Sequence, residues 1–167
     1  TSSSDDTLGA VDGNTAGPAA YNWEDLAFNA SASDLSSVTN CTIRYGGRNT
    51  NYPAGLFLND ASPTITGCTF YQNGDAHLSV NIQNGGDKVK GNLFRYQSGG
   101  NYPVYLHPGA VDSVVINNTF QLRPDNNYNA FVVYTGDITE STTWPVPPTG
   151  FCYYNYYDYV RVTNAAA

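Results

Sequence analysis

The chain has 167 residues, of which only 13% are charged, and its formal net charge at pH 7 is −7. Its seven Lys and Arg residues form no cluster, so the positive surface that phosphate binding requires is missing and we exclude nucleic acid as a partner. No apolar run approaches the ~18 residues of a membrane span, so we expect no span. The length suits a single domain over residues 1–167.

Residues 1–22 form an irregular lead-in or cap that is rich in Ser, Asp, Gly and Ala. Within it, the loop DDTLGAVDGNTAG offers Asp5, Asp6, Asp12 and the amide of Asn14 as oxygen ligands for a structural calcium ion. The loop lacks the regular Asp spacing and the closing Glu of a strong calcium motif, so a solvated turn is the alternative. The sequence gives no reason to expect any other cofactor.

Residues 23–134 are predicted to form stacked coils, which begin at NWEDLAF with Trp23, Leu26 and Phe28. Four copies of a short motif follow in register, 27, 24 and 26 residues apart, and this period is typical of a solenoid or propeller. The copies are VTNCTIRYGG from Val38, ITGCTFYQNG from Ile65, VKGNLFRYQSG from Val89 and VINNTFQLRP from Val115.

Equivalent positions of the copies carry the same chemistry. The first and sixth columns are apolar, the third holds Asn or Gly, and the fourth holds Cys or Asn. Asn and Gly enter the left-handed backbone conformation most cheaply, so the third column predicts a tight bend, after which the fourth turns inward and its amides stack. The four columns are Val38, Ile65, Val89 and Val115; Ile43, Phe70, Phe94 and Phe120; Asn40, Gly67, Gly91 and Asn117; and Cys41, Cys68, Asn92 and Asn118.

A second strand lies between successive copies, in GLFLND, HLSVN, VYLHP and AFVVYTG, each with alternating polarity. Each repeat therefore reads as strand, loop, strand, bend, strand, with no helix. An antiparallel sandwich is the rival fold, but its strands would not repeat the same chemistry in column after column. We predict an all-β solenoid of four to five coils, in which this second strand contributes a central buried column of Leu58, Val80, Leu106 and Val133.

Residues 135–167 contain a Pro-rich bend and then an aromatic strand, and they do not match the repeat. We interpret them as a C-terminal extension or the join to a further block.

The order SDDTLG, NWEDLAF, IRYGG, ASPTITGCTF and INNTF resembles secreted bacterial right-handed parallel β-helix repeat proteins of the pectate-lyase-like superfamily. The resemblance covers essentially the whole chain. It implies a right-handed parallel β-helix that is one block of a larger extracellular or cell-surface protein, with adjoining domains of that chain as partners. Its motifs indicate the fold rather than the function, because the superfamily includes lyases, hydrolases, glycan-binding domains and spacers.

The outward positions of the second strand are the candidate ligand face. None of them is a carboxylate, Lys or Arg, whereas a glycoside hydrolase needs two opposed carboxyl groups. Aromatic rings beside amides and an imidazole suit sugars, whose C–H faces stack on rings while their hydroxyls bond to amides. The predicted ligand residues are Phe57, Asn59, Asn81, Tyr105, His107 and Tyr134, and no catalytic residue is assigned.

Two weaker candidates lie nearby. His107 is the best single residue for proton chemistry, with a surface His bonded to neighbouring amides as the alternative. Arg44, Tyr71 and Arg95 share an outward row on another face, which could hold an acidic glycan or simply be solvated.

The sequence therefore favours a non-catalytic polysaccharide-binding or adhesion module. A β-helix polysaccharide lyase or glycoside hydrolase and a structural spacer of a surface protein are the alternatives. We also predict that Cys41 and Cys68 are buried free thiols, and that Cys152 either labels most readily or pairs with another chain.

Overall fold

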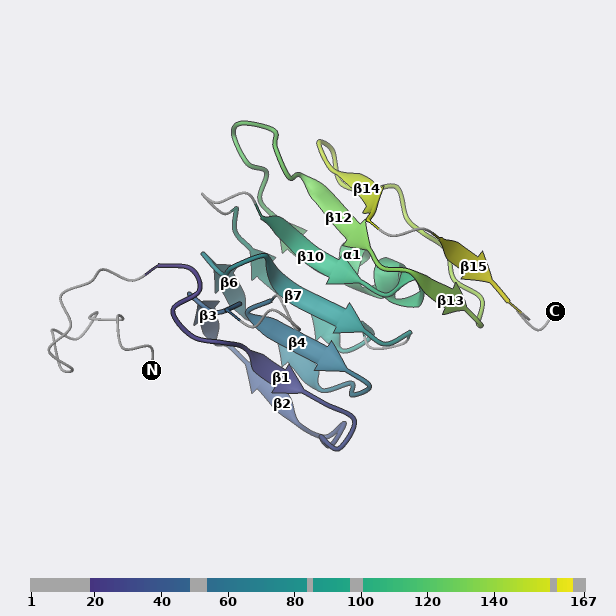
Figure 1. Cartoon of the computed structure of the whole chain (residues 1–167), viewed down its shortest axis with the longest axis horizontal. Coiled ribbons are helices and arrows are strands. Elements are labelled where there is room, and N and C mark those ends of the chain that lie inside the picture. The colour runs from purple at the N-terminus through teal and green to yellow at the C-terminus, as the bar shows by residue number, and fades with distance from the viewer. Residues whose placement is uncertain (1–18, 49–53, 84–85, 97–100, 157–158, 164–167) are drawn as a thin grey trace, which may run out of the picture.

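The computed structural model describes residues 19–48, 54–83, 86–96, 101–156 and 159–163. Within these residues, all the strand pairings are parallel, and the chain winds into a parallel β-solenoid of about 5 turns. Figure 1 shows the coils stacked from β1 and β2 at one end of the molecule to β14 and β15 at the other. The predicted all-β solenoid is confirmed. None of the helices in this part of the chain is long and apolar enough to cross a membrane.

The strands form four sheets. Sheet A has the order β1 (Leu26–Phe28), β4 (Leu56–Asn59), β7 (Ala76–Asn81), β10 (Tyr102–Leu106), β12 (Ala130–Val133) and β14 (Cys152–Asn155). Sheet B contains β2 (Ser37–Thr39), β5 (Thr64–Thr66) and β8 (Val89–Lys90), and sheet C contains β3 (Thr42–Arg44), β6 (Thr69–Tyr71), β9 (Leu93–Phe94) and β11 (Thr119–Phe120). Sheet D pairs β13 (Gly136–Ile138) with β15 (Val160–Val162).

The core follows the predicted columns. Leu58, Val80, Leu106 and Val133 pair in register along sheet A, and each is fully buried. In sheet C, the rings of Phe70 and Phe94 are 4.7 Å apart and those of Phe94 and Phe120 are 4.8 Å apart, both nearly parallel. These distances match the ~4.8 Å between neighbouring strands, so the rings stack one per coil.

The bends between sheets B and C form as the third column predicts. Asn40, Gly67 and Gly91 have φ values of 52°, 66° and 67°, in the left-handed region. At Gly67 a Cβ atom would lie 2.4 Å from the Oδ1 of Asn40, so the neighbouring bend leaves no room for a side chain. The backbone conformation therefore favours Asn or Gly at all three bends, and close stacking additionally requires Gly at position 67.

Asparagine amides bridge the coils beside these bends. Asn92 Nδ2 donates to the carbonyl of Ile65 and to Oδ1 of Asn118, while Asn92 Oδ1 accepts from the backbone N–H of Cys68. Asn118 Nδ2 donates to the carbonyls of Val89 and Val114. Buried polar groups are costly unless they are paired, so this ladder ties three coils together through satisfied amides.

The fourth copy of the motif departs from the prediction that the repeats contain no helix. A 3₁₀ turn, η1 (Pro108–Ala110), leads into α1 (Val111–Ile116), which takes the place of the sheet B strand. Val111, Val114 and Val115 follow helical spacing and are buried, so the helix fills the same core position. Asn117 caps this helix with φ −100° instead of forming a left-handed bend.

The C-terminal segment does not match the repeat in sequence, yet it adds a coil. β14 pairs in parallel with β12 as the last strand of sheet A, and β15 pairs with β13. Between β13 and β14, Trp144 Nε1 donates to the carbonyl of Pro108, which holds the connecting segment against η1.

All three cysteines are free, and Cys68 is buried as predicted. The prediction that Cys41 is buried is wrong. Cys41 belongs to the first coil and follows the bend beside β3, the edge strand of sheet C, so no described coil covers its outer side. Cys152 is exposed.

Candidate functional site

The outward face of sheet A carries the residues that the sequence singled out. Tyr105 is in register with Ser79 on one side and Val132 on the other, and Val132 is in register with Tyr154. The next outward row contains Asn59 and Asn81, whose amides share a hydrogen bond of 3.1 Å.

Two of the predicted ligand residues do not offer an exposed side chain at an outward strand position. Phe57 points to this face but is only 4% exposed, so its ring has almost no surface to offer a ligand. His107 is not at an outward strand position, because β10 ends at Leu106 and His107 caps the 3₁₀ turn that follows. Its Nδ1 accepts a hydrogen bond of 3.1 Å from the N–H of Gly109, as the alternative interpretation of this histidine proposed.

The other predicted aromatic residues belong to a larger cluster. Tyr134 shares a hydrogen bond of 3.0 Å with the buried hydroxyl of Ser79, and its ring meets that of Tyr105 edge-on at 5.6 Å. The ring of Tyr102 lies 6.2 Å from Tyr105, 5.8 Å from Tyr154 and 5.1 Å from Tyr128. We call the whole set the tyrosine face: Tyr102, Tyr105, Tyr128, Tyr134, Tyr154 and Tyr156.

The tyrosine face combines a packed base with exposed rings. Tyr102, Tyr105 and Tyr134 are half-buried, whereas Tyr128, Tyr154 and Tyr156 are 41%, 42% and 57% exposed. Burial raises the pKa of Tyr102 and of Tyr105, so both hydroxyl groups stay neutral at physiological pH. The outcome is an uncharged aromatic surface whose outer rings remain accessible.

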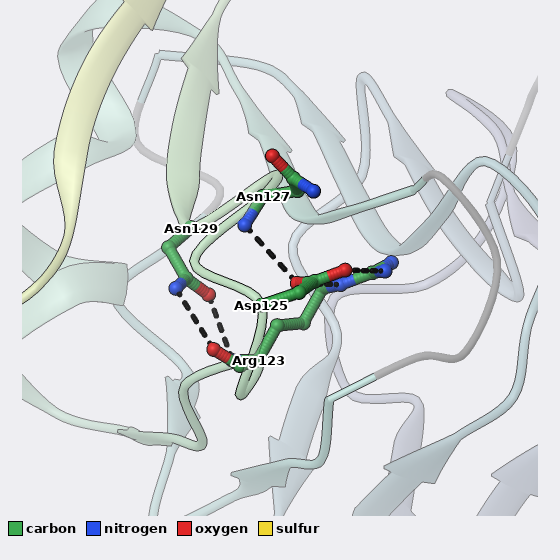
Figure 2. Close-up of polar contacts among 4 residues, drawn as sticks. All are labelled: Arg123, Asp125, Asn127 and Asn129. Carbon is green, nitrogen blue, oxygen red and sulfur yellow. Dashed lines mark hydrogen bonds and ion pairs between the residues drawn. The ribbon is translucent and has the colours of Figure 1, made fainter.

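A short loop positions Tyr128, and Figure 2 shows its polar contacts. Asp125 accepts hydrogen bonds from Arg123 Nε at 3.0 Å and Nη2 at 2.6 Å, and a third from the N–H of Asn127 at 3.1 Å. The side chain of Asn129 accepts from the N–H of Arg123 at 2.9 Å and donates to its carbonyl at 3.4 Å.

This network fixes both ends of the loop. The bond from Arg123 holds the pKa of Asp125 at about 2, so the ion pair persists at any pH where the protein would work. The guanidinium of Arg123 also lies 5.4 Å from the centre of the Tyr128 ring. Tyr128 therefore meets Tyr102 from a prearranged loop.

Among the described residues, Asp75 is a carboxylate that adjoins the tyrosine face without an ion pair. The N–H of Tyr102 donates to the carbonyl of Asp75 in the preceding coil, which places the two residues side by side. Oδ1 of Asp75 accepts a hydrogen bond of 2.8 Å from the hydroxyl of Tyr21, and that hydroxyl accepts from the N–H of Asp75.

The second predicted stripe does form on sheet C. Arg44 is in register with Tyr71, and the guanidinium of Arg95 lies 4.5 Å from the centre of the Tyr71 ring. This cation–π contact occupies a face of the Tyr71 ring on which a sugar could otherwise stack. The stripe therefore offers less free aromatic surface than the sequence predicted.

A fully buried histidine that the sequence did not single out lies at the corner between sheets C and A. His77 Nδ1 is 3.1 Å from Asn73 Nδ2, and His77 Nε2 is 2.6 Å from the carbonyl oxygen of Arg95. Asn73 uses its Oδ1 to accept from the N–H of Gly46, so its Nδ2 is the donor and His77 Nδ1 the acceptor. His77 is thus held as the neutral tautomer with its proton on Nε2, and burial lowers its pKa to about 4.

The structure assigns no metal centre. Within the described ranges, no group of three or more His, Cys, Asp or Glu side chains could hold a metal ion. The predicted calcium ligands Asp5, Asp6 and Asp12, and the amide of Asn14, lie outside the described residues.

Sequence reasoning missed four members of the tyrosine face, and for two of them a signal existed. The register of β14 with β12 places Tyr154 opposite Val132 and Asn155 opposite Val133, so Tyr156 follows in the row of Tyr134. Treating the C-terminal aromatic strand as a further coil would have placed both tyrosines on this face. Tyr128 lies in a loop without periodicity and gave no such signal.

Comparisons of the chain with family models, with curated proteins and with solved structures gave no match. The fold and the tyrosine face are therefore the basis for assigning a function.

Proposed function

We propose that the protein is a non-catalytic, extracellular polysaccharide-binding or adhesion module, and that the tyrosine face is its ligand site. The observation that carries this proposal is the cluster of six tyrosines on one solenoid face, three of them more than 40% exposed. Exposed aromatic clusters mark interaction surfaces, and the C–H faces of sugar rings stack on them.

The dimensions of the face suit a short stretch of an extended glycan. Tyr105 and Tyr154 stand on strands that are two coils apart, so they are separated by ~10 Å along the solenoid axis. A stack of each sugar ring contributes on the order of 1 kcal/mol. Two or three such contacts alone correspond to a dissociation constant of roughly 5–35 mM, so tighter binding comes from the polar groups around the rings and from several modules acting together.

The amide and hydroxyl groups around the rings would orient a bound glycan through hydrogen bonds. Asn81 is exposed beside the face, and its bond to Asn59 uses the Nδ2 group rather than the carbonyl oxygen. Such polar groups fix the position of a ligand whose affinity comes from ring contact.

The experiment is titration calorimetry against the polysaccharide that a glycan array selects. Tyr154→Ala should lower the affinity about fivefold, since it removes one exposed ring worth on the order of 1 kcal/mol. Tyr105, which the sequence placed at the centre of the site, is half-buried between other tyrosines, so it is the less clean test. Tyr159→Ala is the matched control, because Tyr159 is 47% exposed but pairs with Arg161 outside the tyrosine face.

Two outcomes would contradict the proposal. If Tyr154→Ala binds like the unchanged protein, the tyrosine face is not the site, and the stripe of Arg44, Tyr71 and Arg95 becomes the candidate. If the unchanged protein releases unsaturated or reducing-end products from pectin, alginate or a neutral glucan, a lyase or hydrolase activity replaces simple binding.

A structural spacer is the second candidate, and a separate observation supports it. At the C-terminal end of the solenoid, Val133, Trp144, Tyr153 and Val160 line an open hollow of about 580 Å³. A further coil or an adjoining domain of a longer chain would cover these apolar side chains. A spacer requires no glycan, so the absence of any hit on the array would favour it.

A further inference from the structure

The charges around the tyrosine face are unevenly distributed. Asp75 is next to Tyr102, and its carboxylate also raises the pKa of Tyr105, although less than burial does. Among the described residues, Asp75 has hydrogen bonds to Tyr21 and no ion pair.

The cation nearest to the face is already neutralised. The guanidinium of Arg123, which contacts Tyr128, is held by both carboxylate oxygens of Asp125. Among the residues that the structure describes, the face therefore presents aromatic rings and the carboxylate of Asp75, which has no ion pair, on a chain of net charge −7.

Such a surface attracts positive charge by three additive effects. The faces of aromatic rings carry a partial negative charge that binds ammonium groups. The carboxylate of Asp75 adds a direct Coulomb attraction that an exposed site screens only in part. The net negative charge of the whole chain steers cations toward the surface and repels acidic glycans.

We infer that the ligand of the tyrosine face is an amino-sugar polysaccharide, in which ring faces stack on the exposed tyrosines and a protonated amine lies beside Asp75. This inference rests on the proposed function and narrows its substrate class. A regular glycan fits better than a basic peptide, because Tyr105 and Tyr154 stand ~10 Å apart along the solenoid axis and so present rings at a regular spacing rather than around one ammonium group.

The test compares two oligosaccharides that differ in N-acetylation and therefore in charge. A glucosamine hexamer and an N-acetylglucosamine hexamer are titrated at about pH 6, where the amine is protonated and carboxylates are ionised. The glucosamine hexamer should bind roughly tenfold more tightly, from one cation–π contact and one exposed charge pair. The preference should shrink in about 0.5 M salt, which screens the charge pair.

Asp75→Asn isolates the carboxylate with little structural cost. Asn keeps the oxygen that accepts from Tyr21, and it tolerates the positive φ of 42° at this position. This variant should lose most of the preference for the charged hexamer while binding the acetylated one unchanged. Asp60→Asn is the matched control, because Asp60 is an exposed acid with φ 56° at the end of β4 and its replacement changes the net charge equally.

Each result has a defined meaning. Equal binding of the two hexamers, or an unchanged preference in Asp75→Asn, overturns the inference about charge and leaves polysaccharide binding intact. No binding of either hexamer or of any array glycan, with no effect of Tyr154→Ala, overturns the proposed function itself. A lysine hexamer that binds as tightly as the glucosamine hexamer and is insensitive to Tyr154→Ala shows non-specific attraction only, and it overturns both.

Discussion

The buried histidine makes the free energy of unfolding depend on pH in a way that the structure allows us to calculate. His77 has a pKa of about 4 in the folded protein because it is fully buried, against about 6.5 in an unfolded chain. Protonation of Nδ1 would also place two donors, His77 Nδ1–H and Asn73 Nδ2, face to face at 3.1 Å. The folded state therefore resists the proton that the unfolded state accepts.

The sign and the size of the change in the free energy of unfolding follow from this difference in pKa. Above about pH 6.5 the histidine is neutral in both states and has no effect, and as the pH falls toward 4 only the unfolded chain gains a proton. Between about pH 7.5 and pH 5 the free energy of unfolding should drop by about 2 kcal/mol from this residue alone. Below the folded pKa of about 4 the loss levels off.

Urea denaturation at several pH values, followed by tryptophan fluorescence, measures the effect. The chain has only two histidines, which permits a clean control. His77→Gln should abolish most of the pH dependence above about pH 5, whatever it does to absolute stability. His107→Gln should retain most of the pH dependence, because His107 is only half-buried whereas His77 is fully buried. A slope that is the same in His77→Gln and in the unchanged protein would refute the reasoning, as would a histidine NMR titration with both pKa values near 6.5.

Three further predictions concern the core and the cysteines. Phe94→Ala removes the middle ring of the phenylalanine stack and should lower the free energy of unfolding by about 3–5 kcal/mol in urea denaturation. A decrease of less than about 1 kcal/mol would indicate that the rings are not tightly packed. Asn92→Ala removes the acceptor of the Cys68 N–H and a donor to the carbonyl of Ile65, so it should cost about 2 kcal/mol by the same assay. Near-neutral stability would argue against the amide ladder. In the native protein, iodoacetamide should modify the exposed Cys41 and Cys152 but not Cys68, because Cys68 is buried and burial raises its pKa. Mass spectrometry identifies the modified residues, and rapid labelling of Cys68 would contradict its buried position.

The coil architecture could be predicted from the sequence because stacked parallel coils place equivalent residues in register, so the same residue types recur at the same motif positions. Ile43, Phe70, Phe94 and Phe120 recur at one motif position since each must fill the same place in successive coils. The bends were predictable for a separate reason, because the left-handed conformation at Asn40, Gly67 and Gly91 restricts the residue type.

The departures arise where one copy satisfies the same core with another local structure. The fourth copy keeps Val115 in its column, but Val111 and Val114 at helical spacing make a helix bury the same apolar surface. The alternation of polarity along a strand also predicts to which side of the sheet a side chain points, but not how exposed that side chain is. Phe57 points outward as expected, yet it is only 4% exposed.

The candidate site was only partly predictable for the same reason. Tyr105 and Tyr134 could be placed from strand periodicity, whereas Tyr128 reaches the cluster through a loop held by Arg123 and Asp125. The pairing of loop side chains has no period in the sequence. A carboxylate such as Asp75, which comes before its strand rather than within it, escapes a search of outward strand positions.

The parallel register between coils has a mechanical consequence. The backbone hydrogen bonds between β1, β4, β7, β10, β12 and β14 run along the axis on which the coils are stacked, and the described chain starts at one end of that axis and finishes at the other. A pull on the two ends therefore loads the bonds of a terminal coil first and peels the coils away in succession, instead of straining all the ladders at once. Each coil that detaches releases the extended length of its roughly 25 residues, ~85 Å at 3.3–3.6 Å per residue, so the molecule would lengthen in steps and absorb work under tension.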